Sequence, residues 1–186
     1  MSDTAIQEKI IMGIDPGTRV MGYGLIRVVP QRVELLQYGI IRLVKYTEQA
    51  QKLKKIYERI SAIIEEYAPD EVALEAPFLG ENIQVAIKLG RAQGVAMAAA
   101  LARDIPITEY APRKVKQSVT GNGNASKEQV AAMLPQLIYA PNLQKIELDA
   151  TDAIGVALCH HFQANLPQTK NKGWSHFIQQ NPDRIR

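Results

Sequence analysis

The chain has 186 residues, of which 46% are hydrophobic, and carries a formal net charge of +3. This length suits one compact domain, with or without a tail, and the hydrophobic fraction allows a substantial core. The single cysteine, Cys159, excludes an intrachain disulfide framework and a cysteine-rich zinc site, and it indicates a reducing compartment. We find neither a secretory signal nor the roughly 20 consecutive apolar residues that a membrane helix needs, so we expect a cytoplasmic protein without a membrane partner.

Basic residues are concentrated in two parts of the chain. Between residues 82 and 127 there are seven Lys or Arg residues and two acidic ones. Residues 165–186 contain four basic residues and one acidic residue. A basic sector on an otherwise balanced protein favours a polyanionic partner, of which nucleic acid is the commonest. The alternative is a solvated face whose lysines only aid solubility.

The first part of the chain predicts three strands. Lys9–Asp15 is an apolar run, Val20–Pro30 follows a Gly-Thr-Arg turn, and Arg32–Val44 follows a short link. Short links marked by Pro and Gly predict an antiparallel meander. We expect Gly22 and Gly24 to weaken the second of these strands.

The middle of the chain alternates helices and strands. The predicted elements are an amphipathic helix from Thr47 to just before Pro69, a strand at Glu71–Ala76, a helix over 82–103 and a strand at Ile105–Tyr110. This alternation is typical of an α/β fold with parallel strands and crossover helices. The helix over 82–103 is rich in Gly and Ala, which permits close helix packing, and it is our candidate for a subunit interface.

Three more helices are predicted in the rest of the chain. A basic helix, Arg113–Thr120, precedes a turn rich in Gly and Asn. Ser126 and Gln129 then form a capping-box signature for a helix that runs to about Tyr139. The last predicted element is a helix over 147–165.

Four acidic residues occupy positions where carboxylates are costly. Asp15 and Glu75 each end a hydrophobic strand, while Asp149 and Asp152 lie three positions apart near the start of the last helix, on one helix face. Four carboxylates that converge need a cation, and oxygen-only ligands favour magnesium or manganese over zinc. Two such ions support phosphodiester hydrolysis. The alternative interpretation makes these residues turn, strand-end and helix-capping acids.

Other residues are candidates for binding a phosphate backbone or a base. Arg113, Lys114, Lys116 and Lys127 flank the Gly/Asn turn and are expected to contact phosphates, with Lys116 or Lys127 also stabilising charge on the phosphoryl group. Phe78, in the loop after the Glu75 strand, is expected to stack on a base. By contrast, we interpret His160 and His161 as structural or solvent-facing, and Tyr110 as a packed side chain.

Several runs of sequence closely resemble the RuvC family of Holliday-junction resolvases. They are Gly13-Ile14-Asp15-Pro16-Gly17-Thr18, Leu74-Glu75, Lys88-Leu89-Gly90-Arg91-Ala92-Gln93-Gly94, Glu109-Tyr110-Ala111-Pro112-Arg113-Lys114 and Asp149-Ala150-Thr151-Asp152-Ala153. The resemblance implies an RNase H-like fold, with a five-stranded mixed sheet of three antiparallel and then parallel strands flanked by helices.

The resemblance also implies an activity and its partners. It implies a homodimer that holds two Mg²⁺ ions per subunit, with Mn²⁺ as a possible substitute, and that makes paired symmetric nicks in four-way junction DNA. By position, the catalytic and metal-binding acids of the family fall on Asp15, Glu75, Asp149 and Asp152. Cooperation with the RuvA-RuvB branch-migration complex is implied as well.

The expected domain organisation has three parts. Residues 1–8 form an N-terminal extension, residues 9–165 form the nuclease domain, and residues 166–186 form a basic C-terminal tail. Two other functions remain open. One is an actin-like or sugar-kinase-like phosphotransferase, because the segment from Asp15 to Thr18 resembles the phosphate loop of that superfamily. The other is a junction-binding protein without catalysis, which could tolerate loss of the four acids that this chain has.

Overall fold

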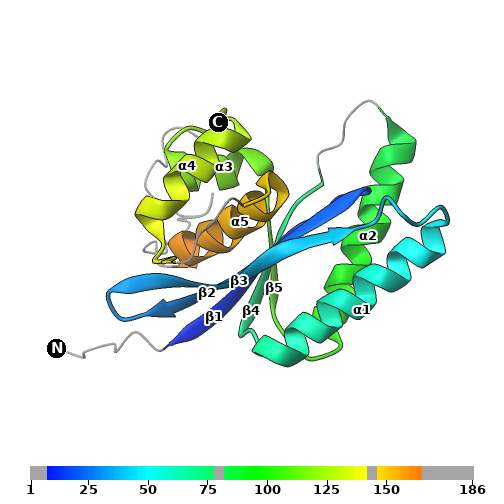
Figure 1. The fold of residues 1–186 in the computed structure, drawn as a ribbon, viewed down its shortest axis with the longest axis horizontal. Coiled ribbons are helices and arrows are strands. Elements are labelled where there is room, and N and C mark those ends of the chain that lie inside the picture. Colours follow the sequence, from blue (N-terminus) through cyan, green and yellow to red (C-terminus); the bar gives the residue numbers. More distant parts are fainter. Residues whose placement is uncertain (1–7, 78–81, 142–145, 165–186) are drawn as a thin grey trace, which may run out of the picture.

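The computed structural model describes residues 8–77, 82–141 and 146–164. Figure 1 shows its helices and strands. In chain order they are β1 (Lys9–Asp15), β2 (Val20–Val29), β3 (Arg32–Arg42), α1 (Gln49–Tyr67), β4 (Glu71–Glu75), α2 (Ile83–Leu101), β5 (Ile107–Tyr110), α3 (Pro112–Thr120), α4 (Lys127–Leu137) and α5 (Leu148–Ala164). Every element predicted from the sequence is present, with small shifts at the ends.

The five strands form one mixed sheet in the order β3-β2-β1-β4-β5. β1 pairs with β2 and β2 with β3 in antiparallel fashion, whereas β1 pairs with β4 and β4 with β5 in parallel. This arrangement confirms the predicted fold class. Among the described residues, no helix combines the length and apolar character needed to cross a membrane.

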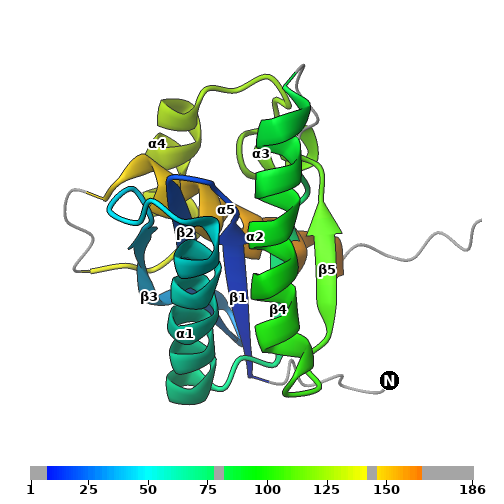
Figure 2. The same cartoon turned by 90° about the vertical axis from the view of Figure 1, so that its right-hand side faces the viewer.

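Helices cover both faces of the sheet. Figure 2 shows α1 and α2 side by side in front of the sheet, with α5 behind it. Successive strand residues point to opposite faces. Met12 and Ile14 of β1 therefore pack with Ile56 and Ile60 of α1, while Ile11 packs with Ile154 of α5 in a second core. The side chain of Asp15 has the parity of Ile11, and it points to the face that carries α5.

Glycines allow α5 to lie directly on the strands. A Cβ atom at Gly22 would stand 1.9 Å from the carbonyl oxygen of Asp149, and one at Gly24 would stand 2.6 Å from Cγ1 of Ile154. No larger residue fits at either position without moving the helix. These glycines were expected to weaken β2, and the structure adds a role that was not foreseen, because the absence of a side chain allows this close approach.

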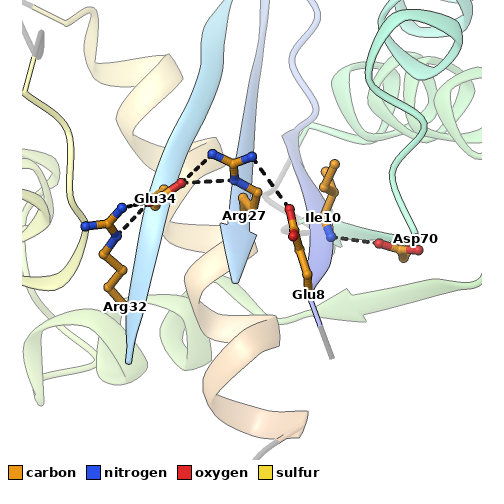
Figure 3. Close-up of polar contacts among 6 residues, drawn as sticks. All are labelled: Glu8, Ile10, Arg27, Arg32, Glu34 and Asp70. Carbon is orange, nitrogen blue, oxygen red and sulfur yellow. Dashed lines mark hydrogen bonds and ion pairs between the residues drawn. The ribbon is translucent and has the colours of Figure 1, made fainter. Parts of the chain in front are cut away.

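A polar network fixes the opposite end of the sheet, far from Asp15 along β1 (Figure 3). Glu34 of β3 accepts hydrogen bonds from Nη2 of Arg27 at 2.6 Å and from Nε of Arg32 at 2.6 Å. These two hydrogen bonds lower the pKa of Glu34. Asp70 accepts a hydrogen bond from the backbone N–H of Ile10 at 2.7 Å, which ties the start of β1 to the segment before β4.

Candidate active site

Two of the predicted acids end neighbouring strands. β1 and β4 run in parallel, with Ile14 opposite Leu74 in the register. The next residues, Asp15 and Glu75, are the last of their strands and lie at the same edge of the sheet. β1 and β4 are therefore neighbours in the sheet, which is the arrangement that convergence of the acids requires.

The other two acids come from the first turns of α5. Asp15 lies opposite Gly22 in the β1–β2 ladder, and the backbone of Asp149 packs on Gly22. Asp15, Asp149 and Asp152 each offer a carboxylate oxygen, and these oxygens lie within 4.8 Å of one another. The start of α5 is held further by Arg42, whose Nη2 donates to Oε1 of Glu147 at 2.6 Å. Three of the four predicted acids thus form one cluster.

Glu75 faces the same cavity as this cluster. The cavity has a volume of about 240 Å³. Its lining residues are Asp15, Glu75, Pro112, Val115, Lys116, Lys127, Val130 and Asp152. The acidic and basic members were expected from the sequence. The apolar wall formed by Pro112, Val115 and Val130 was not expected, because the spacing of apolar residues along a helix does not indicate which cavity they border.

The acids strongly perturb one another. Burial and then the negative charges of Glu75 and Asp152 raise the pKa of Asp15 to about 8. Burial and then the charge of Asp152 raise the pKa of Glu75 to about 7. Burial also raises the pKa of Asp152, although its hydrogen bond from Lys127 acts in the opposite direction. Such a cluster of shifted carboxyl groups in a cavity is typical of functional sites.

Lys127 supplies positive charge to the cluster. It is the first residue of α4, directly after Ser126, whose side chain accepts from the backbone N–H of Gln129 in the predicted capping box. Its Nζ forms an ion pair with Asp152 and lies 3.3 Å from Oδ1 of Asp149. Burial opposes its charge, but the hydrogen bond and ion pair with Asp152 dominate and raise the pKa of Lys127. This lysine was predicted to bind phosphate, and its contact with the acids was not foreseen.

The remaining basic candidates lie on α3. Lys116 lines the carboxylate cavity, and with Arg113 it also borders a neighbouring hollow beside Gly123 and Asn124. Lys114 is exposed on α3 and lines neither. Phe78, the candidate for base stacking, lies outside the described residues.

The donor set fits hard divalent cations. All four acids offer carboxylate oxygens, which magnesium and manganese prefer and which do not favour zinc. The raised pKa values of Asp15 and Glu75 mean that their full ionisation needs more positive charge than Lys127 provides. Bound cations would supply that charge, so this corner of the fold is suited to metal-assisted chemistry on an anionic substrate.

Comparisons with known proteins agree with this geometry. Residues 11–160 match the family model described as crossover junction endodeoxyribonuclease RuvC. A protein of that description from Cytophaga hutchinsonii is 58% identical over 179 residues, covering 96% of this chain and 89% of the relative. Another from Porphyromonas gingivalis is 54% identical over 186 residues, covering 97% and 98%.

Among solved structures, one described as T. thermophilus RuvC in complex with Holliday junction substrate superposes with a TM-score of 0.76 at 29% identity. The match covers 84% of this chain and 94% of that protein. Sequence profile, curated relatives and fold all lead to one assignment. The chain belongs to the RuvC family of crossover junction endodeoxyribonucleases.

Proposed function

We propose that this protein resolves four-way Holliday junctions in DNA recombination and repair by making paired symmetric nicks. The observation that carries the proposal is that carboxylate oxygens of Asp15, Asp149 and Asp152 lie within 4.8 Å of one another. Glu75 faces the same cavity, as does Lys116, whose positive charge suits a phosphodiester. Family membership supports cleavage of junction DNA over a phosphotransferase activity.

The four acids would hold two magnesium ions per subunit, with manganese as a possible substitute. When bound, the ions supply Lewis acidity for the attack of water on a phosphodiester and for departure of the leaving oxygen. Asp15, on the strand between β2 and β4, would serve as a ligand for both ions. Glu75 and the two helix residues, Asp149 and Asp152, would complete the set of ligands.

The basic residues would orient the DNA strand over the acids. Lys116 borders both the carboxylate cavity and the adjacent hollow that Arg113 lines, so these two side chains can contact successive phosphates. Lys127 stands beside Asp152, where it can balance charge as the phosphoryl group transfers. Lys114 is exposed on the same helix and would add a further phosphate contact. Phe78 would stack on a base at the junction.

The proposed enzyme is a homodimer, because two equivalent sites can then act on two symmetry-related strands. We assign the interface of this dimer to α2. One side of α2 exposes an apolar stripe at helical spacing to solvent. Its members are Ile83, Ile87, Gly90, Gly94, Ala98 and Leu101. A Cβ atom at Gly90 or Gly94 would meet nothing within 4 Å, so the partner's backbone can approach closely. A large exposed apolar stripe of this kind is typical of protein interfaces.

Two further assignments rest on the family alone. The RuvA-RuvB branch-migration complex is the proposed protein partner. We place the reaction in the cytoplasm, where the DNA of bacteria lies, because the similar proteins come from bacteria.

The test is incubation with an end-labelled four-way junction and with a linear duplex of the same arm sequence, with Mg²⁺ or with EDTA. We expect symmetric nicks on the junction only, and only with metal. Junction binding without nicks under any metal condition would instead support the non-catalytic alternative.

A further inference from the structure

A second polar cluster lies on the same helix as two of the catalytic acids. His160 of α5 is buried, with 7% of its surface exposed. Its Nδ1 is 2.8 Å from the hydroxyl of Tyr110, and its Nε2 is hydrogen-bonded to Oε2 of Glu71. Lys9 of β1 forms an ion pair with the same carboxylate oxygen. The rings of His160 and Tyr110 also meet edge to face, with centroids 5.7 Å apart.

The hydrogen-bond partners of His160 lie on β4, which carries Glu75, and on β5, which pairs with β4. Glu71 and Glu75 are the first and last residues of β4. Tyr110, the last residue of β5, is the register partner of Glu75, and its carbonyl oxygen accepts from the backbone N–H of Ala76 at 2.8 Å. His160 therefore joins α5 to the first residue of β4 and to the last residue of β5, the strand that pairs with β4 beside Glu75.

His160 and the acids of α5 lie on one rigid element. Asp149 precedes His160 by eleven positions, which is about three helical turns, so both project from nearly the same side of the helix. A small shift or rotation of α5 at His160 would consequently move Asp149 and Asp152 relative to Glu75. The distance between the two sets of acids therefore depends on how α5 is held on β4, in addition to its close packing on β1 and β2.

Apolar packing between α5 and β4 is thin. Ala73 of β4 packs with Val156 and Cys159 of α5, and all three side chains are small. Small side chains make few interlocking contacts, so they define the position of a helix along a strand poorly. Directional hydrogen bonds define it better, and a buried polar pair can specify geometry even where it adds little stability.

We propose that His160 is a positioning residue, whose hydrogen bonds to Glu71 and Tyr110 fix α5 on the sheet and set Asp149 and Asp152 at their working distance from Glu75. The proposal rests on the nuclease function proposed above. It assigns a task to a histidine that does not line the carboxylate cavity.

The test compares His160→Leu with His160→Gln. Leucine removes both hydrogen bonds, while Glu71 keeps Lys9 as its partner, so no carboxylate loses every counter-charge. Glutamine retains an N–H donor for Glu71. We expect His160→Leu to lower kcat for junction cleavage by about 10- to 100-fold and to raise the Mg²⁺ concentration for half-maximal rate. Junction affinity in EDTA should stay unchanged, and His160→Gln should recover most of the rate.

Leu158→Ala is the matched control, because Leu158 is buried on α5 in the core shared with α4, away from Glu71. Unfolding in denaturant gives the stability that each variant loses. Equal loss of cleavage in Leu158→Ala and His160→Leu at equal loss of stability would overturn the proposal, as would wild-type kcat and Mg²⁺ dependence in His160→Leu.

Titration calorimetry with Mn²⁺ separates this proposal from the nuclease assignment. We expect His160→Leu to bind Mn²⁺ more weakly than wild type, whether or not the wild-type protein cuts junctions. Unchanged Mn²⁺ affinity would contradict the positioning role, whereas a wild-type protein that never cuts would contradict only the nuclease function.

Discussion

The backbone of Gly22 lies so close to that of Asp149 that a Cβ atom on Gly22 would stand 1.9 Å from the carbonyl oxygen of Asp149. Gly22 is also the register partner of Asp15. This one contact therefore places an acid of α5 beside the acid of β1. The carboxylate cluster depends on a residue that has no side chain.

Replacing Gly22 by alanine should push the start of α5 away from β2. We expect a loss of stability of about 1–3 kcal/mol, typical of overpacking, together with a large loss of junction cleavage. The control is Gly155→Ala, also on α5, where the new Cβ would meet its nearest neighbour, Cγ1 of Val130, at an ordinary 3.5 Å. Denaturant unfolding and cleavage rates of the two variants provide the comparison. Equal behaviour of both variants would contradict this account of the contact.

The stability of the metal-free protein should depend on pH. The folded-state pKa values of Asp15 and Glu75 are raised to about 8 and about 7, above those of an unfolded chain. Groups with raised pKa values bind protons more tightly when folded, so their contribution is full below about pH 4 and is lost as pH rises through 7 and 8. We expect thermal unfolding in EDTA to shift to lower temperature between pH 6 and pH 8.5.

Mg²⁺ should counter that shift, because bound cations favour the ionised carboxylates. The Mg²⁺-induced rise in Tm should therefore be larger at pH 8.5 than at pH 6. Asp15→Asn should reduce the pH dependence in EDTA. A wild-type Tm that is insensitive to pH in EDTA would contradict the raised pKa values.

Lys127→Met should impair both the metal-free cluster and catalysis. Without this ammonium group, Asp149 and Asp152 lose their ion-pair partner, so stability in EDTA at pH 8 should fall. Cleavage should slow by about 100-fold or more if Lys127 also stabilises the transition state. Lys54→Met is the control, since Lys54 is exposed on α1 and pairs with Glu58 at 3.8 Å, away from the acids. Matching rates for the two variants would exclude a role for Lys127 in cleavage.

Gly94→Arg should disrupt the proposed dimer. Gly94 lies in the middle of the exposed stripe of α2, where an added Cβ atom would meet none of the described residues within 4 Å. We expect sedimentation velocity to show a monomer with the wild-type circular dichroism spectrum. Glu65→Arg, on the exposed face of α1, should remain dimeric. A Gly94→Arg dimer of wild-type affinity would place the interface elsewhere.

Much of the fold could be predicted because its elements are strongly periodic. The four acids were also singled out from the sequence, because carboxylates at the ends of apolar strands, or paired on one face near the start of a helix, are costly without a partner. Lys116 and Lys127, which line the same cavity, were singled out because they flank the Gly/Asn turn. Phe78 remains a prediction, because it lies outside the described residues.

What the sequence could not provide were pairings between distant positions. Glu71 and His160 are 89 positions apart, and no local pattern connects a strand-initiating Glu to a His near the end of a helix. The packing role of Gly22 was missed for a similar reason. Its cost to strand propensity is local, whereas its benefit, the close approach of Asp149, comes from another part of the chain.

The most direct measurement is cleavage of a labelled four-way junction in Mg²⁺ by wild type and by Asp15→Asn, each paired with a binding assay in EDTA. Asparagine keeps the shape of the side chain but removes the negative charge of the carboxylate that we propose binds both metal ions. We predict symmetric nicks by wild type, no nicks by Asp15→Asn, and similar junction affinity for both. Cleavage by Asp15→Asn at the wild-type rate would contradict the central claim that these acids form the active site.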